Sequence, residues 1–386
     1  MCEERAENGT IAFSGSKPVF GMVPPDKARS GKAGHSVSPL QERLFGAPKR
    51  IRRAPVLPAE DNTAEGLRAL LQANVHYRQV PWPQPYRRTT HRLRLGDARD
   101  LSWIPDGSVH LVVTSPPYWT LKEYAADNCD QMGHFEDYDH FLAELDRVWR
   151  ECARVLVGGG RICCVVGDVC IPRKRGGRHH LIPLHSDIQV RARNLGLDCL
   201  QPILWNKIAN GVTEAQGNGA GFYGKPYQPG GIVKNDIEYI LFLRKGGEYR
   251  SAPTLQKALS MLTKDEMKAW FRSIWSDLRG ASTRQGHPAP FPVELAERLI
   301  KMFSFAGDTV LDPFAGTGST SQAAIISGRN SIANEIEAAY VEIARQRIAD
   351  AARRQRSVGA IEAEVVVEKD SRNRRIQALN GIPAAL

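Results

Sequence analysis

The tetrad Ser115-Pro116-Pro117-Tyr118 constrains what this chain can fold into more than any other feature of the sequence. It follows an apolar run, Val109–Val113, which predicts a buried strand. Prolines cannot donate a hydrogen bond to a sheet ladder and hold φ near one value, so the strand must end here in a stiff turn. The turn offers a hydroxyl, a backbone carbonyl and an aromatic face, which together suit a planar heterocycle carrying an exocyclic amine.

A second motif, Thr309–Thr320 (TVLDPFAGTGST), has a similar layout further along the chain. Asp312 ends a short apolar strand, and Gly316 and Gly318 open a turn that leads into a helix-like run, Ser319–Ile326. Glycines at such positions allow the backbone to approach a bound cofactor without an intervening Cβ. Because open α/β sheets bind ligands at the carboxyl ends of their strands, both motifs predict a site at that edge.

An acidic residue, Glu335, ends the next apolar stretch, Asn330–Ile336, where a ribose-binding carboxylate is expected. A G-x-G turn followed by an acid also suits a dehydrogenase that binds a dinucleotide. In this chain the third glycine of the dinucleotide fingerprint is missing, and an aromatic residue, Phe314, stands inside the turn.

The two motifs together resemble those of the exocyclic-amino DNA methyltransferases, which methylate cytosine N4 or adenine N6 with S-adenosylmethionine. The tetrad precedes the cofactor turn, an order that resembles the beta class of this family. The similarity covers residues 91 to about 350. It implies an α/β fold with a doubly wound, mostly parallel, seven-stranded Rossmann-like sheet and helices on both faces, consistent with the alternation of strand and helix patterns.

The resemblance implies that Ser115, Pro116, Pro117 and Tyr118 are catalytic. Ser115 Oγ and the Pro116 carbonyl would accept the two hydrogens of the target amine and stabilise the positive charge that develops on its nitrogen. The Tyr118 ring would stack on the base and add a cation–π contribution of about 1–2 kcal/mol. None of the seven cysteines follows a proline, which argues against the cysteine nucleophile of the methyltransferases that attack cytosine C5.

The same resemblance implies a set of cofactor contacts. Asp97, in the Gly96-Asp97 turn, would bind the adenine of S-adenosylmethionine, and Glu335 would bind its ribose hydroxyls. His287, in the segment HPAPFP, would close over the methionine end. Ala333 stands where the family usually has glycine. The other predicted cofactor contacts are Asp312, Phe314, Gly316, Gly318, Ser319 and Thr320.

The chain divides into segments of different composition. The predicted segments are a flexible basic extension (1–60), a short helix with a proline-rich connector (61–90), the methyltransferase domain (91–350) and a charged C-terminal tail (351–386). Within the domain, the catalytic half is 91–245, the cofactor half is 287–350, and 208–286 contains the target-recognition segments. A helix at Glu337–Ala352 is predicted to close the fold.

The charge balance favours a polyanionic partner. There are 52 Lys and Arg residues against 42 Asp and Glu, a net charge of +10. With the resemblance, this predicts double-stranded DNA as the substrate, with the target base flipped out of the stack. Adjacent His179 and His180 lack a third ligand at suitable spacing, so no metal is predicted. The residues assigned to DNA contact are Trp119, Arg173, Lys174, Arg175 and Arg178.

The sequence also carries information on the compartment. No apolar run reaches the ~18 residues that a membrane span needs, and the amino terminus lacks the layout of a signal peptide. Seven cysteines without C-x-x-C spacing predict reduced thiols in a cytoplasmic protein. A cognate restriction endonuclease is an expected partner, whereas the sequence predicts no oligomeric state.

Three hypotheses for the function remain open at this stage. Cytosine-N4 methylation is favoured because position 115 is serine, whereas family members that act on adenine usually carry Asp or Asn there. Adenine-N6 methylation is the second hypothesis. The third is a protein that binds nucleic acid and keeps the fold without turnover, although Ser115, Tyr118, Asp312 and Glu335 are all intact.

Overall fold

The structure of the chain is a computed structural model that describes residues 54–119, 132–171, 177–178, 180–207, 235–280, 291–358 and 361–369. The predictions for His287, Arg173, Lys174 and Arg175 lie outside these residues. So do most of the predicted N-terminal extension and the segment 208–234.

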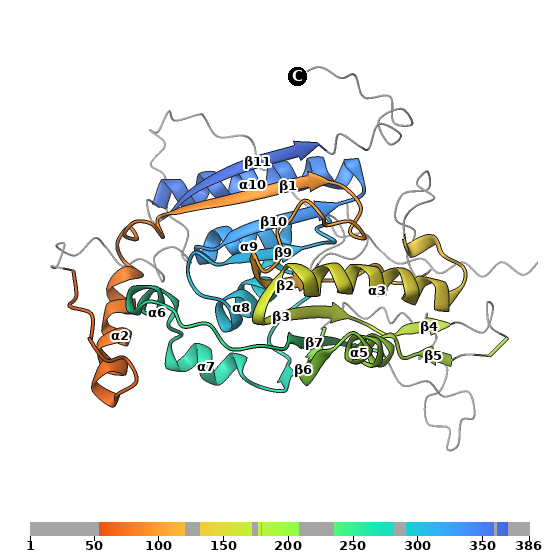
Figure 1. The fold of residues 1–386 in the computed structure, drawn as a ribbon, viewed down its shortest axis with the longest axis horizontal. Helices are drawn as coiled ribbons and strands as arrows, with labels where there is room; N and C mark the ends of the chain where they lie inside the picture. Colours follow the sequence, from red (N-terminus) through yellow and green to blue (C-terminus); the bar gives the residue numbers. More distant parts are fainter. Residues whose placement is uncertain are drawn as a thin grey trace, which may run out of the picture. The chain divides into compact units, whose positions relative to one another are not determined.

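A large β-sheet forms the centre of the described chain (Figure 1). Its strands are β1 (Arg88–Leu95), β2 (Val109–Thr114), β3 (Leu156–Val166), β6 (Leu197–Asn206), β7 (Ile237–Lys245), β8 (Ile274–Trp275), β9 (Thr309–Asp312), β10 (Asn330–Glu335) and β11 (Glu362–Lys369). Their order across the sheet is β11-β1-β10-β9-β2-β3-β7-β6-β8. A separate antiparallel pair consists of β4 (Val169–Ile171) and β5 (His180–Ile182).

The predicted seven-stranded sheet is confirmed as the inner part of this larger one. The strands from β1 to β6 in the order above run parallel except β7, which is antiparallel to both of its neighbours, β3 and β6. Two edge strands extend it, because β8 pairs with β6 and β11 pairs with β1, each in parallel. Among the described residues the sheet therefore has nine strands.

Helices cover the sheet on both faces. They are α2 (Ala64–Tyr77), α3 (Tyr138–Val155), α5 (Leu184–Asn194), α6 (Thr254–Ser260), α7 (Lys264–Trp270), α8 (Val293–Phe303), α9 (Ser319–Ser327) and α10 (Ala338–Val358), with a 3-10 turn at Met132–His134. Apolar residues of α3 and α5 pack on one face, and those of α8, α9 and α10 pack on the other. None of the described helices is long and apolar enough to cross a membrane.

The central strands show why the sheet is wound on both sides. In β2, Val112 packs in the cluster beneath α3, whereas Leu111 and Val113 pack in the cluster beneath α8. Successive side chains of a strand point to opposite faces, so a strand that is apolar at every position must be covered twice. This continuous apolar pattern accounts for the position of β2 inside the sheet.

The helix α3 shows how local sequence fixes an element. Asp137 caps its start, because the Asp137 side chain accepts a hydrogen bond from the His140 N–H at 2.6 Å. Phe141, Leu145 and Trp149 recur at four-residue spacing and are all at most 1% exposed. Burial of each such side chain is worth about 1.5–3 kcal/mol, so this apolar face holds the helix on the sheet.

The C-terminal region differs from the sequence expectation. The helix α10 continues to Val358 rather than ending at Ala352, and β11 pairs with the whole of β1, from Arg88 opposite Glu362 to Leu95 opposite Lys369. Three consecutive valines give this segment strand propensity, but the charged residues around them obscured the pattern. Charges are tolerated here because β11 is an edge strand.

Candidate active site

Four neighbouring strands bring the two sequence motifs to one edge of the sheet. The strands β1, β10, β9 and β2 are adjacent and parallel, so their carboxyl ends lie on the same side. These ends lead directly into Asp97, Glu335, Asp312 and Ser115. Residues from distant parts of the sequence therefore converge at the carboxyl edge, as the motifs predict.

Asp312 links the tetrad strand to the cofactor turn. Its Oδ1 accepts a hydrogen bond from Thr114 Oγ1 at 2.7 Å, and its Oδ2 accepts one from Thr320 Oγ1 at 2.7 Å. The N–H of Phe314 also donates to Oδ1, at 3.2 Å. The carboxyl is 1% exposed, and this burial raises its pKa from 3.8 to about 6 while the three hydrogen bonds oppose the shift.

A Thr114→Val variant tests this link. It keeps the side-chain shape but removes the donor from the buried Asp312 carboxyl, so we expect the free energy of unfolding to fall by about 1–3 kcal/mol. Urea denaturation monitored by circular dichroism measures the loss. Thr90→Val, at an exposed position in β1, is the matched control and should change stability little. Equal losses in the two variants would contradict the assigned role.

The glycine turn wraps around the carboxylate of Glu335. The N–H of Gly316 donates to Glu335 Oε2 at 2.7 Å, and the N–H of Glu337 donates to Oε1 at 3.0 Å. Gly318 has φ +79°, a left-handed conformation, and a Cβ on it would lie 3.2 Å from atoms of Ala344 and Ile348. The turn is therefore close against α10 and requires glycine at position 318.

Glu335 is an unusual buried acid. It is 8% exposed, and burial raises its pKa from 4.5 to about 7. The hydrogen bonds from the two N–H groups act against this rise in pKa. The nearby Asp312 charge adds to the rise. A carboxyl held in this way is suited to accept hydrogen bonds from hydroxyl groups of a ligand.

The remaining predicted cofactor residues lie at or near this edge. Ser319 and Thr320 begin α9 and are at most 6% exposed, and Phe314 is partly buried against the core. Asp97 follows β1, but its carboxylate is held by Arg99, whose side chain binds both carboxylate oxygens at 2.5–3.0 Å. Arg99 also donates to Glu144 at 2.7 Å. Asp97 is thus an ion-paired turn residue in this structure.

The tetrad lies between the ends of β2 and β3. Pro116 is buried and Tyr118 is 6% exposed, whereas Ser115 and Pro117 are partly exposed. A Cβ placed on Gly167, just beyond β3, would lie 3.4 Å from Cε1 of Tyr118, so glycine gives the ring room at this place. Trp119, assigned to DNA contact, packs edge-on against Tyr138 with ring centroids 5.0 Å apart.

Sequence reasoning missed a pair beside the tetrad. His185 Nδ1 lies 2.6 Å from Oδ1 of Asp168, which is 3% exposed and follows Gly167. The His185 ring stacks on Tyr239, with centroids 3.6 Å apart. The buried position of Asp168 after an apolar strand was a signal, but nothing in the sequence connected it to a histidine 17 residues away.

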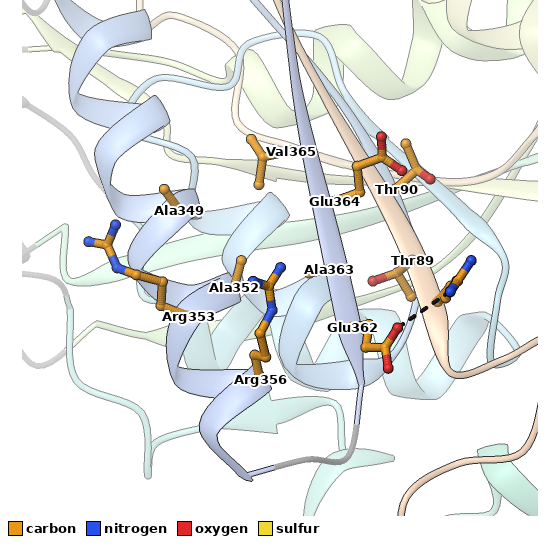
Figure 2. Close-up of a pocket in the computed structure, with 11 residues that line it drawn as sticks. Thr89, Thr90, Ala349, Ala352, Arg353, Arg356, Glu362, Ala363, Glu364 and Val365 are labelled. Carbon is orange, nitrogen blue, oxygen red and sulfur yellow. Dashed lines mark hydrogen bonds and ion pairs between the residues drawn. The ribbon is translucent and has the colours of Figure 1, made fainter.

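Of the four basic residues assigned to DNA contact, Arg178 alone falls within the described residues, and it is exposed. No cluster of three or more metal-binding side chains occurs among the described residues. A pocket between α10, β1 and β11 lies at the opposite edge of the sheet, near the amino end of β1, where Arg88 pairs with Glu362 at 3.4 Å (Figure 2). It contains none of the motif residues, so it is distinct from the candidate active site.

Comparison with known proteins finds similarity to DNA methylases and methyltransferases. A family model described as DNA methylase matches residues 109–346. The type II methyltransferase M.MjaI of Methanocaldococcus jannaschii is 38% identical over 289 residues, 67% of this chain and 91% of that protein. M.MthZI of Methanothermobacter thermautotrophicus is 34% identical over 68% of this chain and 77% of its own length. TTHA0409 of Thermus thermophilus, solved in complex with S-adenosyl-L-methionine, is 48% identical, with a TM-score of 0.57 over 72% of this chain and 98% of that one.

Proposed function

The chain belongs to the N6/N4 family of DNA methylases, and from this membership we propose that it methylates cytosine N4 in double-stranded DNA. Its cofactor is S-adenosyl-L-methionine. When bound, this cofactor supplies an electrophilic methyl group on a sulfonium centre.

The residues at the carboxyl edge fit this cofactor. Gly316 and Gly318 place no Cβ atom at two positions of the turn, and Glu335 is a buried acceptor for the two ribose hydroxyls. Asp312, Phe314, Ser319 and Thr320 surround the rest of the turn. Each oxygen of Asp97 already accepts two hydrogen bonds from Arg99, so its proposed contact with the adenine amine requires these bonds to rearrange.

The observation that supports the proposal most directly is the 2.7 Å hydrogen bond from Thr114 to Asp312. It joins the residue that precedes the tetrad to the residue that begins the cofactor turn, 198 positions apart in the chain. Methyl transfer to an amine requires the nitrogen and the methyl group to be within reach of each other. The direct contact between the two motif strands supports the proposal that their sites adjoin.

The tetrad supplies the chemistry of activation. The lone pair of an exocyclic amine is delocalised into its ring, so the nitrogen must be drawn away from planarity before it can act as a nucleophile. We propose that Ser115 Oγ and the Pro116 carbonyl accept its two hydrogens, and that the Tyr118 ring stacks on the flipped base. The methylated nitrogen would release one proton to solvent water after the transfer, so no strong base is needed beforehand.

Cytosine is proposed over adenine because the acceptor at position 115 is a serine hydroxyl. The longer oxygen acceptor of Asp or Asn, usual in family members that act on adenine, is absent from this position. Adenine-N6 methylation is the alternative that the same fold and cofactor would serve. A restriction endonuclease that cleaves the same DNA sequence is proposed as the companion of this enzyme.

The product of the reaction decides between the two bases. Purified protein is incubated with plasmid DNA and S-adenosylmethionine labelled in the methyl group, and the nucleosides of the digested DNA are separated by chromatography. We expect the label in N4-methylcytosine. Label in N6-methyladenine would replace the cytosine proposal by the adenine alternative. No incorporation into several DNAs of mixed sequence would favour a binding protein without turnover.

A further inference from the structure

Asn334 lies at the meeting point of the two turns that the proposed function assigns to the cofactor. It is the penultimate residue of β10, opposite Arg94 in β1, and it is 1% exposed. Glu335, the proposed ribose acceptor, follows it directly. Nothing in the sequence motifs singled out this residue, because it stands inside a strand.

Two hydrogen bonds of Asn334 join separate segments. Its side-chain Nδ2 donates to the carbonyl of Gly96 at 2.9 Å, in the turn that carries Asp97. Its backbone carbonyl accepts from the N–H of Ala315 at 3.0 Å, in the glycine turn. A third bond, from the N–H of Gly96 to the carbonyl of Glu335 at 2.9 Å, completes the junction. One residue therefore connects the ends of β1, β9 and β10.

The other side-chain atom of Asn334 is a buried acceptor without a donor. Among the described residues its Oδ1 has no hydrogen-bond partner. The oxygen also lies close above Gly96, since a Cβ on that residue would be 2.9 Å from it. Turning the amide over would put this oxygen against the Gly96 carbonyl, so the orientation with Nδ2 toward Gly96 is the favourable one. A buried acceptor without a donor is costly, so it calls for an explanation, and a donor on a bound ligand is one.

We propose that Asn334 is a positioning residue for the nucleoside part of the cofactor. It fixes the distance between the Gly96-Asp97 turn and the Phe314–Gly318 turn, and its Oδ1 is available to a donor of the bound adenosine. This inference rests on the proposed cofactor contacts of those two turns. A leucine or valine at this position would fill the strand equally well but would leave the Gly96 carbonyl without its donor.

The test is the affinity for S-adenosylmethionine and for S-adenosylhomocysteine, measured by isothermal titration calorimetry on the full chain without DNA. For Asn334→Ala we expect both dissociation constants to rise about tenfold, in line with a lost hydrogen bond. Asn334→Asp, which keeps the shape but places an acceptor against the Gly96 carbonyl, should bind no better than the alanine variant. At saturating cofactor, kcat should stay within about threefold of the wild type, so the lost affinity should appear as a higher KM for S-adenosylmethionine.

Asn330→Ala is the matched control. Asn330 begins the same strand, and its side chain makes two bonds, accepting from the Thr90 N–H at 2.9 Å and donating to the Gly307 carbonyl at 2.6 Å. It lies at the end of β10 away from the cofactor turns. Its loss should lower the melting temperature, as in Asn334→Ala, without changing either dissociation constant.

The outcomes separate the inference from the proposed function. Unchanged cofactor affinity in Asn334→Ala or Asn334→Asp, with normal binding by the wild type, would overturn the role of Asn334 alone. An equal loss of cofactor affinity in Asn330→Ala would also overturn this role, because the effect would then belong to the strand as a whole. Failure of the wild type itself to bind either compound would overturn both the inference and the cofactor assignment.

Discussion

The Ser115→Ala variant is expected to turn over about 100-fold more slowly than the wild type, the usual cost of removing one preorganised group that stabilises developing charge. Its dissociation constant for S-adenosylmethionine should stay unchanged. The hydrogen bond that anchors this strand end belongs to Thr114 and Asp312, so the loss of the Ser115 hydroxyl leaves the link to the cofactor turn intact. Single-turnover methylation assays and calorimetry provide the two measurements.

Ser108→Ala is a suitable control for this experiment. Ser108 immediately precedes β2 at its other end, and its hydroxyl donates to the Pro105 carbonyl at 2.6 Å. Both variants remove one hydroxyl at the boundary of the same strand, but only Ser115 belongs to the tetrad. If Ser115→Ala lost cofactor affinity and kcat in equal proportion, its proposed contact with the target amine would be wrong.

Cofactor affinity is expected to increase with pH through the titration of Glu335. The pKa of this carboxyl is raised to about 7 by burial, so its ionised fraction rises from about 0.1 at pH 6 to about 0.9 at pH 8. Ribose hydroxyls donate more strongly to the ionised form, so the dissociation constant for S-adenosylmethionine should fall about tenfold over this interval. Calorimetry at several pH values measures the profile.

The sign of the effect on stability is opposite. Because the pKa in the folded protein lies above the ordinary value of 4.5, the folded state binds the proton more tightly than the unfolded state. The free energy of unfolding of the cofactor-free protein should therefore decrease as pH rises from about 4.5 to about 7. Asp312, with a pKa raised to about 6, contributes in the same direction.

Glu335→Gln isolates the contribution of Glu335. The variant cannot ionise, and its amide would set a donor against the N–H groups of Gly316 and Glu337 if it turned toward them. At pH 8 we expect affinity to fall about 100-fold, consistent with losing two hydrogen bonds to a charged acceptor. The pH profile between 6 and 8 should become flat. A slope that persists in the variant would assign the titration to another group.

The sequence located the two motifs because their chemically informative residues stand beside the prolines and glycines that end strands. A proline pair ends a strand after Val113, and glycines follow Asp312, so both motifs could be placed at strand ends and from there at one edge of a parallel sheet. The fold class followed from the alternation of strand and helix patterns. What these signals share is that each depends on residues close together in the chain.

The rest depended on contacts between distant residues. Thr114 appears in the sequence as one more strand residue, and its bond to Asp312 exists only because β2 and β9 are neighbours. Asn334 and His185 were missed for the same reason. Asp97 was placed correctly after β1, but its ion pair with Arg99 was not expected. Only the local turn, in which the Asp97 side chain accepts from the backbone N–H two residues on, is a common pattern. The edge strand β11 was hidden by charged neighbours.

The strand order also bears on how the protein is made. As the chain leaves the ribosome, β1 appears early, yet both of its sheet neighbours, β10 and β11, lie beyond residue 329. One side of β2 likewise stays unpaired until β9, residues 309–312, has been synthesised. Unpaired strand edges therefore persist through most of synthesis. Folding that depends on pairing between strands far apart in the sequence is slow and prone to aggregation. Nascent chains stalled before β9 should depend on chaperones far more than the finished protein does.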